Sequence, residues 1–326
     1  MAMIEVFGLT KEYAGVRAVD RVEFTCEKGE IVGLLGSNGA GKTTTMRMLT
    51  CYIPPTGGTA RMAGFDILRQ SIEVRRRIGY LPESVPLYTE MRVREYLAYR
   101  ARLKGVSRRD LKSRIDEVLG KCGLTDVGSR IIGQLSKGYR QRVGLADAVI
   151  HHPEIVILDE PTIGLDPHQI RLIRDLIKEL GEKHTVLLST HILSEVEMLC
   201  GRVIIINRGR IVAMDTPDQL VRQLAAKNRI RVEVHGKPAD VVIRSLRALP
   251  GVKDARSRGA DAVLFEVEND PTKDVRREIF GLAAREGWDL RELAFERATL
   301  EDAFVEFTAA PATTPAAAGI PQEVSA

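Results

Sequence analysis

The most constraining feature of this 326-residue chain is the segment Gly36–Thr43, which reads GSNGAGKT. It fits the pattern G-x-x-x-x-G-K-[ST] and lies between an apolar, strand-like run and a run with helical character. Glycines let the N–H groups of such a loop turn toward an anion, and the helix that follows presents its positive end to the same point. The sequence therefore predicts a phosphate-binding loop in an α/β fold, with a chance glycine-rich turn as the alternative.

Two side chains of this loop are expected to carry its chemistry. Lys42 would reach the β- and γ-phosphates of a nucleotide, and the Thr43 hydroxyl would hold Mg²⁺. The candidate nucleotide-binding residues are the members of the loop and the threonine that follows it: Gly36, Ser37, Asn38, Gly39, Ala40, Gly41, Lys42, Thr43 and Thr44.

Two carboxylates end the apolar run Ile155–Leu158, which predicts a strand in the centre of a sheet. Ligands of open α/β sheets bind at the carboxyl edge of the strands, where Asp159 and Glu160 would emerge. We expect Asp159 to hold Mg²⁺ and Glu160 to orient or deprotonate the attacking water. A purely structural role would leave a buried acidic pair without a cation, which is costly.

Two further side chains are predicted at the same edge of the sheet. His191 follows the strand-like run TVLLST and is placed to sense the terminal phosphate, although a single histidine after a strand is usually a surface or core residue. Asp166 precedes Pro167, a pattern typical of a helix N-cap followed by the first helical residue. A catalytic role for Asp166 is compatible with capping.

A second anion site is predicted at Ser136 and Gly138, which precede a helix. The Ser136 hydroxyl and the open N–H groups of the helix start can both hold an anion. The loop Gly36–Thr43 already supplies the one phosphate cradle that a subunit needs. We therefore expect the second site to serve a nucleotide held by another subunit.

Seven segments with this chemistry follow one another along the chain: Tyr13, Gly36–Thr44, Leu81–Ser84, Leu135–Tyr139, Ile155–Pro161, Gly164–Pro167 and His191. In this order the chain resembles the ATP-binding subunits of ABC transporters over residues 3 to about 220. The resemblance implies an α/β P-loop ATPase with a RecA-like parallel sheet, an antiparallel β subdomain and a helical subdomain at about 88–152. It also implies that Tyr13 stacks on adenine, that Glu83 binds Mg²⁺, and that two copies close head to tail on two ATP molecules.

Three letters depart from the usual family pattern. Glu83 stands where the family usually has Gln, and Lys137 and Tyr139 replace Gly and Gln of the signature. These letters look like those of the ABC-2 exporter branch, which implies a separate integral membrane permease as partner. We expect the permease to contact the loop after Glu83 and the helix from Met91, with Tyr88 and Tyr96 as anchors or, alternatively, as ordinary packing residues.

The pattern of the chain changes near residue 220. Residues 221–308 read as strand, helix, two strands, helix and strand, which predicts a small α+β ferredoxin-like accessory domain. Residues 309–326 are rich in Ala and Pro and lack periodicity, so we expect disorder there. The first domain would therefore span 1–220.

The composition indicates in which cellular compartment the chain works. No apolar run approaches the ~20 residues needed to cross a bilayer, and the N-terminus does not read as a signal peptide. The four cysteines are scattered, so reduced thiols are expected rather than a metal site or disulfides. We expect a cytoplasmic protein that is peripheral to the cell membrane through its permease.

A basic segment of the chain is compatible with a second class of function, binding to nucleic acid or ribosomes. Between Met91 and Arg114 nine residues are basic and two are acidic, a local charge of +7. Such a patch favours anionic lipid or nucleic acid, or it is a solvated helix face. A soluble ABC-family ATPase acting on ribosomes or nucleic acid is therefore the alternative, although we expect no nucleic acid partner. A regulatory protein with an inactive ATP site is a third hypothesis, against which the intact Lys42, Asp159 and Glu160 argue.

Overall fold

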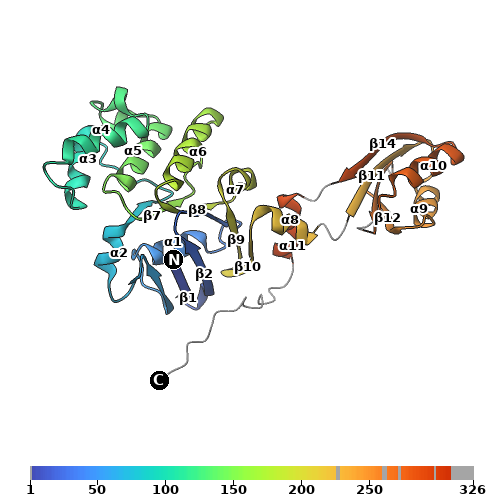
Figure 1. Cartoon of the computed structure of the whole chain (residues 1–326), viewed down its shortest axis with the longest axis horizontal. Coiled ribbons are helices and arrows are strands. Elements are labelled where there is room, and N and C mark those ends of the chain that lie inside the picture. Colours follow the sequence, from blue (N-terminus) through green and yellow to red (C-terminus); the bar gives the residue numbers. More distant parts are fainter. Residues whose placement is uncertain (1, 225–227, 259–262, 271–272, 297–298, 310–326) are drawn as a thin grey trace, which may run out of the picture. The chain divides into compact units, whose positions relative to one another are not determined.

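The computed structural model describes residues 2–224, 228–258, 263–270, 273–296 and 299–309 (Figure 1). The chain divides into one unit of Met1–Pro217 with Phe307–Ala326, and a second unit of Asp218–Glu306. The division falls close to the expected boundary at 220. Of the segment 309–326, for which disorder is predicted, all but Ala309 lies outside the described residues.

The first unit begins with an antiparallel sheet of four strands. Its strand order is β2-β1-β4-β5, and β1 and β2 form a long hairpin. Apolar side chains alternate with exposed ones along β2, as expected where one sheet face is covered. The bounds are β1 Ala2–Tyr13, β2 Val16–Glu27, β4 Gly57–Met62 and β5 Phe65–Asp66.

The second sheet of this unit is largely parallel and holds the candidate site. Its order is β10-β9-β3-β8-β7-β6, and only β10 runs antiparallel to its neighbour. All residues of β7 and β8 are buried, which is typical of parallel strands covered on both faces. The bounds are β3 Ile31–Leu35, β6 Ile78–Leu81, β7 Ile155–Asp159, β8 Thr185–Thr190, β9 Arg202–Asn207 and β10 Arg210–Asp215.

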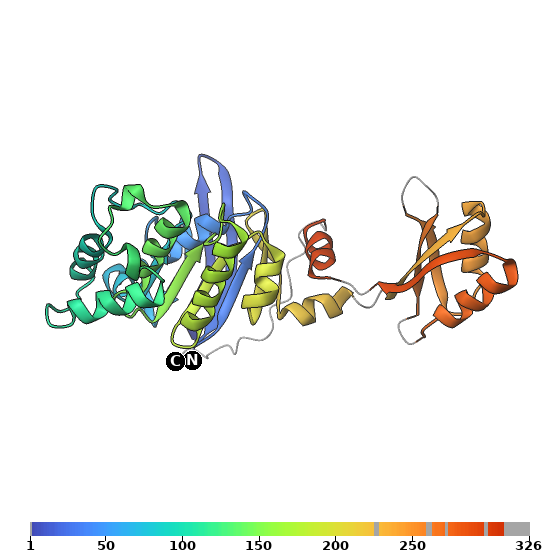
Figure 2. The ribbon, with the colours of Figure 1, turned by 90° about the horizontal axis from the view of Figure 1, so that it is seen from above.

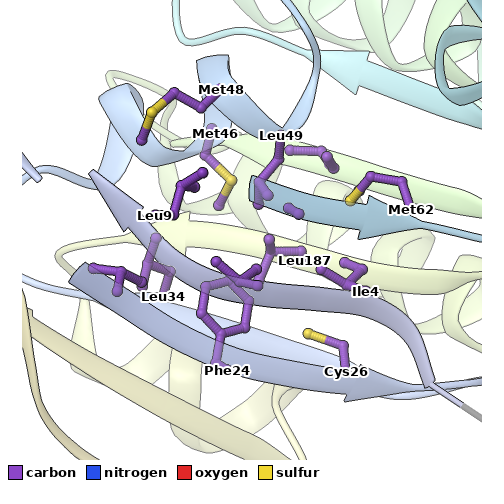
Figure 3. Close-up of a cluster of buried hydrophobic side chains, with 14 of the residues drawn as sticks. Ile4, Leu9, Phe24, Cys26, Leu34, Met46, Met48, Leu49, Met62 and Leu187 are labelled. Atoms are coloured by element: carbon purple, nitrogen blue, oxygen red, sulfur yellow. The ribbon is translucent and has the colours of Figure 1, made fainter. Parts of the chain in front are cut away.

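The helix that follows the glycine-rich loop lies between the two sheets. This helix, α1 (Lys42–Leu49), contributes Met46, Met48 and Leu49 to a core that also takes side chains from both sheets (Figure 3). All three side chains are fully buried. The packing therefore fixes α1, and with it the loop, against the centre of the parallel sheet.

Three helices form the group expected at about 88–152: α3 (Val93–Leu103), α4 (Leu111–Lys121) and α5 (Lys137–Val149) (Figure 1). The buried Asp147 of α5 joins this group, because it pairs with Arg100 of α3 and with Lys104, which directly follows α3, at 3.0 Å each. The remaining helical segments of the unit, including two short 3₁₀ turns, are α2 Ser71–Arg77, α6 Pro167–Gly181, α7 Leu193–Leu199, η1 Thr125–Val127 and η2 Ile132–Gln134.

The second unit contains a four-stranded antiparallel sheet with strand order β12-β13-β11-β14. Its elements follow one another as βαββαβ, and both helices lie on one face of the sheet (Figure 2). This is the ferredoxin-like arrangement predicted from the sequence. Trp288 lies in its core with only 8% of its surface exposed. The bounds are β11 Asn228–His235, α9 Ala239–Arg247, β12 Val252–Ser257, β13 Leu264–Asn269, α10 Arg276–Glu286 and β14 Asp289–Glu296, with α8 Pro217–Leu224 and α11 Leu300–Ala309 flanking them.

Candidate functional site

The glycine-rich loop leaves the carboxyl end of β3 in a conformation that requires glycine. Gly39 and Gly41 have φ angles of 78° and 108°, a left-handed region that residues with a Cβ rarely adopt. A Cβ at Gly36 would lie 2.5 Å from the Ile206 carbonyl oxygen, and one at Gly41 would lie 2.7 Å from the Ala18 carbonyl oxygen. The space near Gly39 is open. The loop is therefore closely backed by the protein on one side and accessible on the other.

Lys42 lies at the centre of this loop with its ammonium group buried. Its Nζ donates to the carbonyl oxygens of Gly36 at 2.8 Å and Ser37 at 3.3 Å. The same nitrogen lies 3.2 Å from Glu160 Oε1. The lysine thus holds the loop around itself and presents a positive charge where the sequence predicts phosphate.

Asp159 ends β7 beside Thr43 and Ser189. Its Oδ1 accepts hydrogen bonds from Ser189 Oγ at 2.5 Å and from Thr43 Oγ1 at 3.3 Å. Burial raises the pKa of Asp159, and the two hydroxyl donors oppose that shift. Within the described part of the chain, Asp159 Oδ2 is buried without a hydrogen-bond partner. A hard cation such as Mg²⁺ fits this arrangement, because it would bind the free carboxylate oxygen and favour the ionised form.

Glu160 lies in a strained turn directly after β7. Its φ angle is 48°, and its N–H donates to Ser189 through both the carbonyl oxygen at 3.2 Å and Oγ at 3.0 Å. His191, just past β8, places Nδ1 2.8 Å from Glu160 Oε2. Lys42 and His191 therefore flank the two oxygens of one buried carboxylate, which suits a group that handles a water molecule next to phosphate.

The adjacency of β3, β8 and β7 explains why these residues meet. β8 lies between the other two strands, so their carboxyl ends place Lys42, Thr43, Asp159, Glu160 and His191 at one edge of the sheet. Ser189 is not among the site residues expected from the sequence. Its position two residues before His191, at the end of the strand, was the available signal, and Ser189 pairs with Asp159 across the sheet.

Two candidates stand apart from this cluster. Glu83 is exposed in the loop after β6, and its negative charge helps to raise the pKa of Asp159. Tyr13 is 45% exposed at the end of β1, and the Lys11 ammonium lies 5.1 Å from the centre of its ring. Both side chains are accessible, so each can approach a ligand, but among the described residues no hydrogen bond or ion pair joins either one to the loop.

The predicted helix caps are confirmed. Ser136 caps α5 by accepting from the Tyr139 N–H, and Asp166 caps α6 by accepting from the Gln169 N–H at 2.9 Å. The Gln169 side chain lies directly against Gly138, since a Cβ at Gly138 would be 2.2 Å from Gln169 Oε1. The two helix starts therefore touch, a contact that the sequence did not reveal.

Lys137 extends along the turn that precedes α6. A Cβ built at Gly164 would lie 2.2 Å from Lys137 Nζ, and Gly164 has a φ angle of 68°. The charge of Lys137 is therefore directed toward the turn that carries Asp166, within its own subunit.

The fold and the site together define a nucleotide-binding α/β ATPase. Residues 19–163 match the sequence profile of the ABC transporter family. The chain is 44% identical over 199 residues to the ABC transporter ATP-binding protein NatA of Bacillus subtilis, covering 60% of this chain and 81% of NatA. It is 33% identical over 311 residues to the daunorubicin/doxorubicin resistance ATP-binding protein DrrA of Streptomyces peucetius, covering 95% and 93% of the two chains.

A solved dimeric structure of the ATP-binding cassette MJ0796, in a post-hydrolysis state with ADP and phosphate, is also similar. Its TM-score is 0.61 and its identity 26%, over 66% of this chain and 98% of that one. The chain therefore belongs to the ATP-binding proteins of ABC transporters, and it is an ATPase. Among the described residues, every helix is too short or too polar to span a bilayer.

Proposed function

We propose that this ATPase powers export through a separate ABC-2 type membrane permease. The observation that carries the proposal is a cavity of about 470 Å³ next to the candidate site. Glu83 lines the cavity, and so does Asp159, the candidate metal ligand. A permease segment seated there would contact the loop that approaches the metal site. The relative DrrA, whose name states drug resistance, supports a role in export.

The mouth of the cavity carries aromatic side chains suited to a protein partner. Tyr52 lines the cavity and is 73% exposed. Tyr88 does not line the cavity itself, but it is 48% exposed and contacts Tyr96, which does. Tyr88 packs edge-on against Tyr96, with the ring centres 5.9 Å apart. Tyr96 itself is only 3% exposed and its hydroxyl faces Asp147. Tyr88 therefore remains a candidate anchor for the permease. Tyr96 is a packing residue, which was the alternative role given to both tyrosines.

We assign Mg²⁺ to Thr43 and Asp159, with Glu83 as a further ligand. The buried, unbonded Asp159 Oδ2 supports the assignment, and the exposed Glu83 carboxylate shares a cavity with Asp159. The ion would neutralise charge that develops on the phosphates.

Two copies of the chain are proposed to close head to tail on two ATP molecules. Each ATP would lie between the loop at Lys42 of one copy and the segment Ser136–Gly138 of the other, while Tyr13 stacks on adenine. The dimeric state of the similar cassette supports this arrangement. Within one copy the Gln169 side chain lies against Gly138, on the side where a Cβ would project.

Sharing of the two sites can be tested with Ser136→Arg in a mixed dimer. The bulky cation should block the nucleotide held by the other copy, so a dimer with one variant subunit should lose one of its two active sites. Ser113→Arg, on the exposed side of α4, is the matched control. Full activity at both sites of the mixed dimer would contradict sharing.

The alternative action on ribosomes or nucleic acid has less support. Five of the nine basic residues between 91 and 114 have partners: Arg94 with Asp116, Arg100 and Lys104 with Asp147, Arg114 with Glu117, and Arg92 with the Ser129 carbonyl. Part of the positive charge is therefore balanced by carboxylates of the helical group itself. We propose that the chain lies at the cytoplasmic face of the membrane, bound through the permease.

The export hypothesis can be tested by capturing the chain after gentle detergent extraction. A multi-span membrane protein should co-purify and alter the ATPase rate. Tyr52→Ala should weaken this association without changing the rate of the isolated chain, and Phe280→Ala, which removes another exposed aromatic, is the control. Recovery of ribosomes or DNA without a membrane protein would favour the alternative.

A further inference from the structure

Glu195, on α7, is a fully buried carboxylate that the assigned chemistry does not use. Its Oε1 accepts from the Thr162 hydroxyl at 2.5 Å, and its Oε2 accepts from the Thr190 hydroxyl at 2.9 Å. Both threonines are buried as well. A carboxylate removed from water is costly unless its oxygens are bonded, so this arrangement calls for an explanation.

The two threonines flank the proposed catalytic groups. Thr162 lies two residues after Glu160, in the turn where the Ile163 N–H donates to the Glu160 carbonyl oxygen at 3.2 Å. Thr190 immediately precedes His191, and its hydroxyl also accepts from the Ile192 N–H at 3.0 Å. The Glu195 carboxylate therefore bonds to both backbone turns: the one that carries Glu160 and the one that carries His191.

Glu195 also reaches a third element. Arg174 of α6 places Nη2 3.7 Å from Glu195 Oε1. The same helix begins at Asp166 and carries Gln169, which lies against Gly138. A displacement of α6 would therefore shift Glu195. Through its hydrogen bonds to Thr162 and Thr190, it would also shift the turns that carry Glu160 and His191.

We infer that Glu195 is a positioning residue for ATP hydrolysis: it holds the Glu160 turn and the His191 turn in mutual register and links both to α6. It does not touch nucleotide. The inference rests on the proposed roles of Glu160 and His191, and it is independent of the export hypothesis.

The test compares Glu195→Gln with Glu197→Gln, an exposed neighbour on the same helix. A glutamine keeps the shape of Glu195 but has one acceptor oxygen, so one threonine can no longer donate and must instead accept a hydrogen bond from the amide NH2. A shift of about 1 Å at a catalytic group costs on the order of 100-fold in rate. We expect kcat per folded protein to fall about 10- to 100-fold in Glu195→Gln, while the nucleotide Kd stays within about twofold and Glu197→Gln matches the parent.

A second pair of variants keeps the inference falsifiable if Glu195→Gln folds poorly. Thr162→Ser retains the hydroxyl donor and should retain kcat, whereas Thr162→Val removes the donor and should lower kcat without weakening nucleotide binding. Unchanged kcat in folded Glu195→Gln and Thr162→Val would overturn the inference. If Glu160→Gln also left hydrolysis unchanged, the proposed site itself would be wrong. If Glu160→Gln alone stopped hydrolysis, only the role of Glu195 would fail.

Discussion

Lys42 and Glu160 form a buried ion pair, with 3.2 Å between Nζ and Oε1 and each side chain 6% exposed. The lysine expected to bind phosphate thus faces the carboxylate expected to activate water. An incoming phosphate would compete with Glu160 for the same ammonium group. Binding of nucleotide is therefore expected to exchange one anion for another at Lys42.

Glu160→Gln should slow hydrolysis by about 10²- to 10⁴-fold, the usual contribution of a general base. Nucleotide affinity should not fall, because a neutral amide competes less with phosphate for Lys42, and an ATP-bound dimer should accumulate. Single-turnover hydrolysis, nucleotide titration and size-exclusion chromatography would measure these effects. Glu182→Gln, at an exposed position after α6, is the control. Hydrolysis at the parent rate would refute the role given to Glu160.

Lys42→Ala should abolish tight nucleotide binding and also destabilise the fold. The substitution leaves the buried Glu160 carboxylate without its cation, which costs about 3–5 kcal/mol in comparable buried pairs. Adding Glu160→Gln to Lys42→Ala should restore much of that stability, since the uncompensated charge is gone. Urea unfolding of the two single variants and the double variant measures the coupling. Additive losses in the double variant would show that the pair is not energetically linked.

Asp159→Asn should raise stability without ligand while weakening the Mg²⁺-dependent ATPase. Burial raises the folded-state pKa of Asp159 above its ordinary value, so the ionised form is disfavoured in the folded protein. Such a group lowers stability as the pH rises from its unfolded pKa through its folded pKa. The variant should therefore melt at a higher temperature than the parent at neutral pH, and the difference should vanish below about pH 3.8. Asp175→Asn, at an exposed position on α6, should show no such pattern.

Much of the candidate site could be predicted because its residues follow strands or begin helices. Asp159, Glu160 and His191 each lie at or just after the end of a strand, and Lys42 begins the helix after the glycine-rich loop. Parallel strands bring such positions to one edge of the sheet. The caps Ser136 and Asp166 were predictable for the same reason, since an N-cap is a local pattern.

Contacts between segments far apart in sequence could not be predicted. Ser189, Gln169 and Glu195 acquire meaning only through partners on other elements. The buried position of Tyr96 depends in the same way on Asp147, which lies 51 residues further along the chain. Short elements with weak periodicity, such as β5 and α2, were also missed in the sequence, because tertiary packing rather than local propensity defines them.

Asp147→Ala should destabilise the helical group that borders the cavity. It removes a buried partner of Arg100 and Lys104, for an expected cost of about 3–5 kcal/mol. The pKa of Asp147 is lowered by Lys104 and Arg100 against the opposing effect of burial. Its stabilisation is therefore present above the unfolded pKa and is lost as the pH falls through the lower folded pKa.

Denaturant unfolding of Asp147→Ala at neutral and acidic pH tests this prediction. Asp116→Ala, which breaks the exposed pair with Arg94, should cost no more than about 1 kcal/mol and serves as the control. Equal losses in the two variants would contradict the importance assigned to burial.

Because Trp288 is buried in a core, its fluorescence reports on the folding of the unit that contains it. The chain has one tryptophan, and that residue lies in the core of the second unit. Tryptophan emission will therefore follow melting of the ferredoxin-like unit, whereas far-ultraviolet circular dichroism follows both units. Transitions that coincide would show that the two units unfold together, and transitions that separate would show that the accessory domain is thermodynamically autonomous.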